Sequence, residues 1–126
     1  IMDISGVLLS IQSLLDNNPL ENEPGFAGKQ TDNHTLYRES VAYENFRTLI
    51  YKNIFNIPTN FQCFQEVILN HYKERRDHIY ADLNKYIYES KLNEANVCIP
   101  IYRINLTLNF SKLKEVLIMK DSELSM

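Results

Sequence analysis

The sequence has little of what several common protein classes require. Glycine occurs three times, and no glycine-rich phosphate-binding loop is present. The two cysteines, Cys63 and Cys98, have neither the CxxC spacing of a metal or redox site nor the density of a disulfide scaffold. The net charge of -3 provides no basic surface of the kind that binds phosphate backbones. Nucleic acid is therefore not an expected partner.

Long hydrophobic runs are also missing. No apolar run approaches the roughly 20 residues that cross a bilayer, and no basic segment with an apolar core opens the chain. We expect no membrane partner, and no signal peptide is visible in the sequence, which leaves a cleaved one open. Two cysteines outside any disulfide pattern favour reduced thiols in the cytoplasm or the nucleus. The 126 residues, of which 44% are hydrophobic and 23% charged, suit one globular domain.

Apolar spacing predicts a mainly α chain with about four helices. The first runs from Ile4 to about Leu15, with Asp3 as its cap and its apolar residues on one face. The other side of the helix carries almost no charge, so we expect the helix to be covered on most sides. It therefore needs a large surface to pack on. The other helices are expected at about 36–55, at about 59–90 and, after a cap at Ser111, around residues 113–117.

Finer expectations concern the inner faces of these helices. Thr59-x-x-Gln62 has capping-box spacing at the start of the third helix, and Pro100 excludes a central strand from the β-prone segment 97–108. The segment is expected to be extended or irregular. The inner positions are expected to be Ala42, Phe46, Leu49, Ile50 and Ile54 in the second helix, and Phe64, Ile68, Tyr72, Arg75, Ile79, Leu83 and Ile87 in the third.

Two stretches near the start carry a family resemblance. "VLLSIQSLL", followed by an Asn-Pro loop and "NEPGF", resembles the ubiquitin-conjugating enzymes. "NEPGF" is similar to the subgroup with extra C-terminal helices, such as the Z-type conjugating enzyme and the conjugating domain of the giant inhibitor-of-apoptosis protein. "LYRESVAYENFRTLIYKNI" and "FQCFQEVILNHY" are similar to the next two helices of that subgroup. The specific resemblance covers roughly residues 4 to 80.

The resemblance implies a parent domain with an α+β fold. In the family, a helix, a four-stranded antiparallel sheet and a His-Pro-Asn motif come first, and the catalytic cysteine precedes the "VLLSIQSLL" helix. By that order the sheet and the cysteine are expected upstream of Ile1. Residues 1–57 would be the C-terminal part of the core, and residues 58–126 a helical C-terminal extension. A fragment without the cysteine should be inactive by itself.

The implied activity is transfer of ubiquitin or a ubiquitin-like protein. A cysteine accepts the modifier as a thioester from an activating enzyme, and a substrate lysine then attacks it, with a ligase as a further partner. An acidic residue after the first helix orients or deprotonates that lysine in many members. The matching candidates are Glu21, Asn22 and Glu23, and each is also readily explained as a solvated loop residue.

The remaining reactive residues receive structural interpretations. Cys63 and Cys98 are read as small buried hydrophobic residues and not as nucleophiles, because neither has an electropositive setting. His71, Glu74 and His78 share a helix face, but no second cluster supplies a further ligand, so solvated histidines are favoured over a zinc site. No metal or cofactor is expected.

Two other functions stay open. One is a catalytically inactive variant of the family that binds ubiquitin or a partner enzyme. The other is an unrelated helical protein-interaction module. Such a module would fold cooperatively as the isolated chain, whereas half of a domain would expose the apolar face of its first helix and bind hydrophobic dye.

Overall fold

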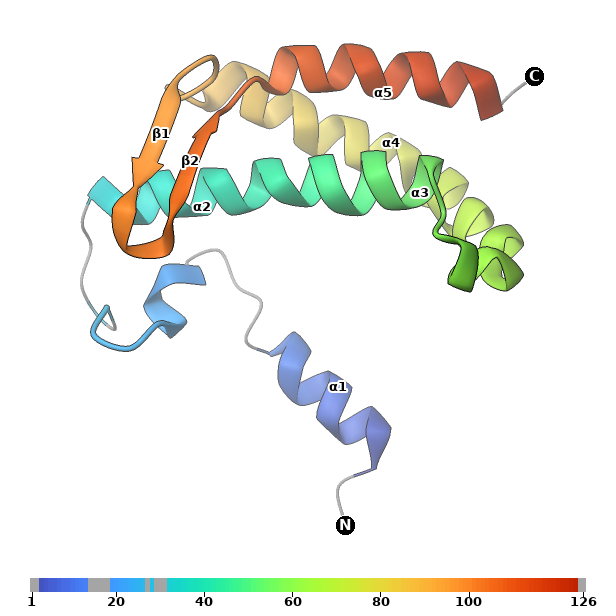
Figure 1. Ribbon diagram of the computed structural model, residues 1–126, viewed down its shortest axis with the longest axis horizontal. Helices are drawn as coiled ribbons and strands as arrows, with labels where there is room; N and C mark the ends of the chain where they lie inside the picture. The colour runs from blue at the N-terminus through green and yellow to red at the C-terminus, as the bar shows by residue number, and fades with distance from the viewer. Residues whose placement is uncertain (1–2, 14–18, 27, 29–31, 125–126) are drawn as a thin grey trace. The chain divides into compact units, whose positions relative to one another are not determined.

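The computed structural model describes residues 3–13, 19–26, 28 and 32–124 (Figure 1). They fall into two compact units, Ile1–Glu39 and Ser40–Met126. The chain is mainly helical, with one two-stranded antiparallel sheet. The predicted mainly α class is confirmed, and its four helical stretches lie close to the expected places. The proposed division between residues 57 and 58 stays a prediction.

The first unit begins with α1 (Ile4–Gln12), whose polar groups are satisfied locally. The carboxylate of Asp3 accepts a hydrogen bond from the backbone N–H of Gly6 at 2.7 Å, which confirms the predicted cap. The hydroxyls of Ser10 and Ser13 donate to carbonyls of the helix itself. No residue of α1 is buried. The predicted end of this helix, around Asn17, lies outside the described residues.

The second helical stretch changes its winding along its length. It starts as α2 (Asp32–Glu44), continues as a π-helix (Asn45–Lys52) and ends as α3 (Asn53–Phe55). In the π-helical part the N–H of Asn53 reaches the carbonyl of Thr48, five residues back. At its start the guanidinium of Arg47 donates to both carboxylate oxygens of Glu44, at 2.7 to 3.1 Å.

This wider winding corrects the predicted inner face. Leu49 was expected inside but is 55% exposed, because a π-helix moves side chains away from the positions that the 3.6-residue period assigns. Phe46 keeps an inner position and contacts the ring of Tyr86 edge to face, with centroids 6.1 Å apart. Beyond the π-helix, Phe55 meets Tyr72 in the same way at 5.4 Å.

The third stretch opens with a tighter turn than predicted. Residues Thr59–Phe64 form a 3-10 helix, and the 25-residue α4 (Gln65–Glu89) follows. No side-chain cap forms at the start of the 3-10 helix, so the predicted capping box of Thr59 and Gln62 is wrong. Phe64 is exposed instead of buried because it precedes the α-helical ladder. Tyr72 and Leu83 are buried as expected, whereas Arg75, which the same spacing placed inside, is exposed because burying an unpaired charge is costly.

A β-hairpin connects α4 to the last helix. Strand β1 (Asn96–Ile99) pairs with β2 (Ile104–Thr107), with Asn96 opposite Thr107. Pro100 begins the short 3-10 connection (Pro100–Tyr102), where no ladder hydrogen bond needs its missing N–H. The predicted extended segment is therefore a hairpin of two edge strands. Val97 and Ile99 point into the core, and Cys98 between them points outward.

The last helix, α5 (Phe110–Leu124), is longer than expected and has a different cap. Asn109, not Ser111, accepts the N–H of Lys112 at 2.8 Å. The side chain of Asn93 accepts the N–H of Phe110 and donates to the hydroxyl of Ser111. In Figure 1, α5 runs alongside α4, which it contacts.

The core of the second unit lies between α4, α5 and the hairpin. The ring of Phe110 stacks on Tyr86 with centroids 5.0 Å apart and meets Tyr43 edge to face at 5.3 Å. The buried hydrophobic residues of this unit are Tyr72, Leu83, Val97, Ile99, Leu108, Phe110, Leu113 and Leu117.

Candidate functional site

The acidic loop of the first unit is built from two consecutive turns. Pro19–Asn22 form a 3-10 helix anchored by the buried side chain of Leu20. The N–H of Glu23 donates to the carbonyl of Leu20 at 3.1 Å, and the N–H of Phe26 donates to the carbonyl of Glu23 at 3.2 Å. Gly25 has φ +87°, the conformation that the third residue of a type II turn needs. In the turn Glu23–Phe26, Pro24 and Gly25 thus occupy the two central positions that favour proline and glycine.

The three predicted site residues lie together in this loop. Asn22 is exposed, and Glu21 and Glu23 are half-buried. The Glu23 carboxylate lies near Tyr37, whose pKa is raised first by burial and then by this negative charge. Within the described part of the chain, Glu21 forms no ion pair. Its carboxylate can therefore accept an incoming ammonium group without breaking a salt bridge.

Both cysteines are exposed, which corrects the expectation that they are buried. Cys63 lies in the 3-10 helix before α4, where the turn has no core to face. Cys98 occupies the outward position of β1 between two buried residues. Both belong to the second unit, whereas the acidic loop belongs to the first.

A polar cluster joins α4 and α5 in the second unit. The hydroxyl of Tyr72 donates to the Asp121 carboxylate at 3.2 Å, and the guanidinium of Arg76 lies 3.5 Å from the same carboxylate. The hydroxyl of Tyr80 is buried nearby. Burial raises the pKa of Tyr72 strongly, with further contributions from Tyr80 and Asp121. This arrangement keeps the Tyr72 hydroxyl protonated as a hydrogen-bond donor.

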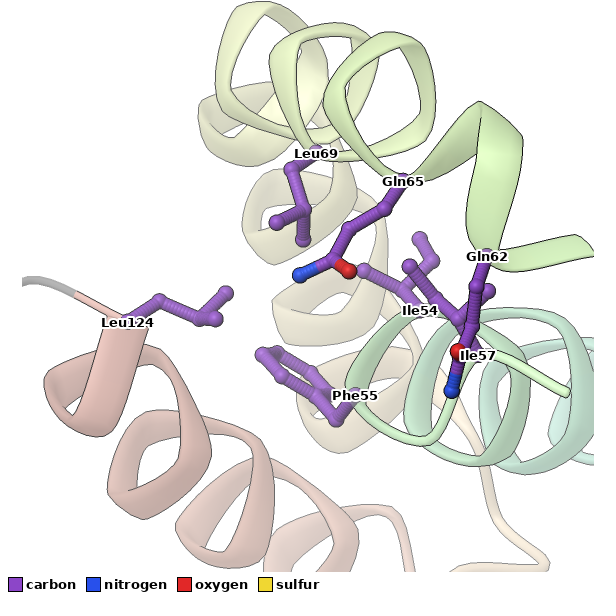
Figure 2. A pocket seen from close by; sticks show the side chains of 7 residues that line it. All are labelled: Ile54, Phe55, Ile57, Gln62, Gln65, Leu69 and Leu124. Carbon is purple, nitrogen blue, oxygen red and sulfur yellow. The ribbon is translucent and has the colours of Figure 1, made fainter. Parts of the chain in front are cut away.

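A pocket of about 220 Å³ lies where α3, the start of α4 and the end of α5 meet. Figure 2 shows Phe55, Leu69 and Leu124 pointing toward one another from these three elements. Ile54 and Ile57 add apolar walls, and the amides of Gln62 and Gln65 line the rim. A second hollow, of about 420 Å³, shares Leu124 and is lined otherwise by Lys73, Arg76 and Asp121.

Sequence reasoning did not identify this pocket. Its walls come from segments far apart in the chain, and Leu124 enters only because α5 is longer than the sequence pattern indicated. The spacing of Gln62, Gln65 and Leu69 by three and four residues was the available signal, since such residues share a helix face.

The described residues present neither a metal-binding cluster nor a helix that could cross a bilayer. Over residues 3–13, 19–26, 28 and 32–124, no group of three or more histidine, cysteine or acidic side chains is arranged to hold a metal ion. His71 and His78 are both exposed. None of the helices in the described ranges combines the length and the apolar character that a bilayer crossing needs.

Comparison with known proteins assigns no family. No protein-family model matches the chain, and no curated protein matches its sequence.

Proposed function

We propose that this chain is the C-terminal part of a ubiquitin-conjugating domain that carries ubiquitin or a ubiquitin-like protein as a cysteine thioester. The observation that supports the proposal most is α1. This helix contains the first six residues of the family-like sequence "VLLSIQSLL", and its large apolar side chains are 40 to 81% exposed. A helix of this composition is stabilised in proteins by packing rather than by its own propensity. The family's sheet, upstream of Ile1, would provide that packing surface.

On this proposal the acidic loop borders the thioester. Its two turns fix the backbone at Glu21 and Glu23, and a carboxylate there attracts the ammonium of a substrate lysine. The same carboxylate accepts the proton that the lysine nitrogen loses as it attacks the thioester carbonyl; the C–N bond forms, the C–S bond breaks, and the catalytic cysteine leaves as a thiolate. Glu21 is the better candidate, because the negative charge of Glu23 already acts on Tyr37, whose pKa it raises.

The proposed partners follow from this activity. They are ubiquitin or a ubiquitin-like protein, an activating enzyme and a ligase, and the proposed location is the cytoplasm or the nucleus. The parent domain would have the α+β fold of the family, with residues 58–126 as the helical extension that contacts partners.

A helical protein-interaction module is the second candidate. It is favoured by the second unit, which closes a core of its own between α4, α5 and the hairpin without any residue of α1. A catalytically inactive relative, which keeps the binding surfaces and lacks the thiol, fits the same observation. Both alternatives predict binding without transfer.

The deciding experiment is a charging assay on the protein encoded with the segment upstream of Ile1. It is incubated with activating enzyme, ubiquitin and ATP and resolved with and without reductant. The proposal predicts an adduct that reductant removes and that persists in the Cys63→Ser/Cys98→Ser double variant. The 126-residue chain alone should form none. An adduct on Cys63 or Cys98, or no adduct on the longer protein, would refute the proposal.

A second variant separates charging from transfer. Glu21→Gln in the longer protein should charge normally and discharge to free lysine more slowly, because the neutral amide cannot accept the proton. Glu94→Gln, an exposed acid of the second unit, is the matched control and should leave discharge unchanged. Equal discharge in both variants would remove Glu21 from the site.

A further inference from the structure

We draw no further inference here: the strongest candidate, the pocket lined by Phe55, Leu69 and Leu124 where α3, α4 and α5 meet, carries no proposal because nothing in the structure shows what would occupy it.

Discussion

Individual asparagine side chains determine how the last helix of the second unit begins. Asn109 accepts the N–H of Lys112, and Asn93 accepts the N–H of Phe110 from across the hairpin. Two of the backbone donors that every helix start leaves unpaired are thereby satisfied. Phe110 is completely buried, so these bonds also hold the central aromatic residue of the core in place.

Replacing Asn109 by alanine should therefore lower the free energy of unfolding by about 1 kcal/mol, the usual effect of losing a helix cap. Chemical denaturation of the variant measures this change. Asn105→Ala is the control, since Asn105 is exposed on β2 and should change stability by less than about 0.5 kcal/mol. A fully stable Asn109→Ala variant would show that the hydrogen bond to Lys112 contributes nothing.

The buried tyrosines predict how stability depends on alkaline pH. Burial raises the pKa of Tyr72 and of Tyr80 above the ordinary value of about 10. Above about pH 10 the unfolded chain loses these protons while the folded chain keeps them, so the free energy of unfolding falls as pH rises. Below about pH 10 the contribution is fully present.

Tyr72→Phe should reduce this alkaline loss of stability, because one of the coupled hydroxyls is gone. Urea unfolding between about pH 8 and about pH 11 measures the slope. Tyr88→Phe is the control, since Tyr88 is 82% exposed, and its slope should match that of the unmodified chain. Identical slopes for all three proteins would mean that Tyr72 ionises in the folded state as it does in the unfolded one.

At the scale of elements, the 3.6-residue period of the α-helix predicted most of the side chains that the helices turn toward the core. It placed Tyr72 and Leu83 correctly because α4 is a regular helix there. It misplaced Leu49 and Phe64, which lie in a π-helix and at the end of a 3-10 helix. Neither winding has the period that was assumed, and both depend on tertiary packing that local spacing does not encode.

The two faces of α4 should respond very differently to truncation. Leu83→Ala should cost roughly 2 to 5 kcal/mol, because Leu83 is fully buried and the substitution leaves a cavity. Val67→Ala should change stability by less than about 0.5 kcal/mol, because Val67 is 67% exposed. Denaturation midpoints of both variants test the assignment. Similar losses at the two positions would mean that α4 buries another face.

The candidate sites differ in how far sequence could predict them. Glu21, Asn22 and Glu23 were named from the family resemblance, and they share one loop because they are consecutive in the chain; their role stays a prediction. The pocket between α3, α4 and α5 was missed because it joins Phe55, Leu69 and Leu124 from three distant segments. The cysteines were predicted to be buried on the general preference of free cysteine, whereas a 3-10 helix and an outward strand position expose them.

At the scale of the whole molecule, the two units differ in what they bury. The second unit has a core of large side chains, whereas α1 in the first unit has none, and Ile4, Leu8, Leu9 and Ile11 are each more than half exposed. An exposed apolar face of this kind indicates an interaction surface. In the proposed function, that surface is the contact with the family's sheet.

The 126-residue chain should therefore bind a hydrophobic dye through α1. A Leu8→Ser/Ile11→Ser variant should bind less dye and melt at the same temperature, because both side chains are more than half exposed. In the longer protein the same variant should melt at a markedly lower temperature. A lower melting temperature in the 126-residue chain itself would show that α1 already has its packing partner.

The central claim is that this chain continues a conjugating domain, and the coding sequence directly upstream of Ile1 tests it most directly. The account predicts a segment that encodes alternating strands, then a His-Pro-Asn motif and then a cysteine shortly before Ile1. An upstream sequence with neither the motif nor the cysteine would contradict the account and leave the helical interaction module in its place.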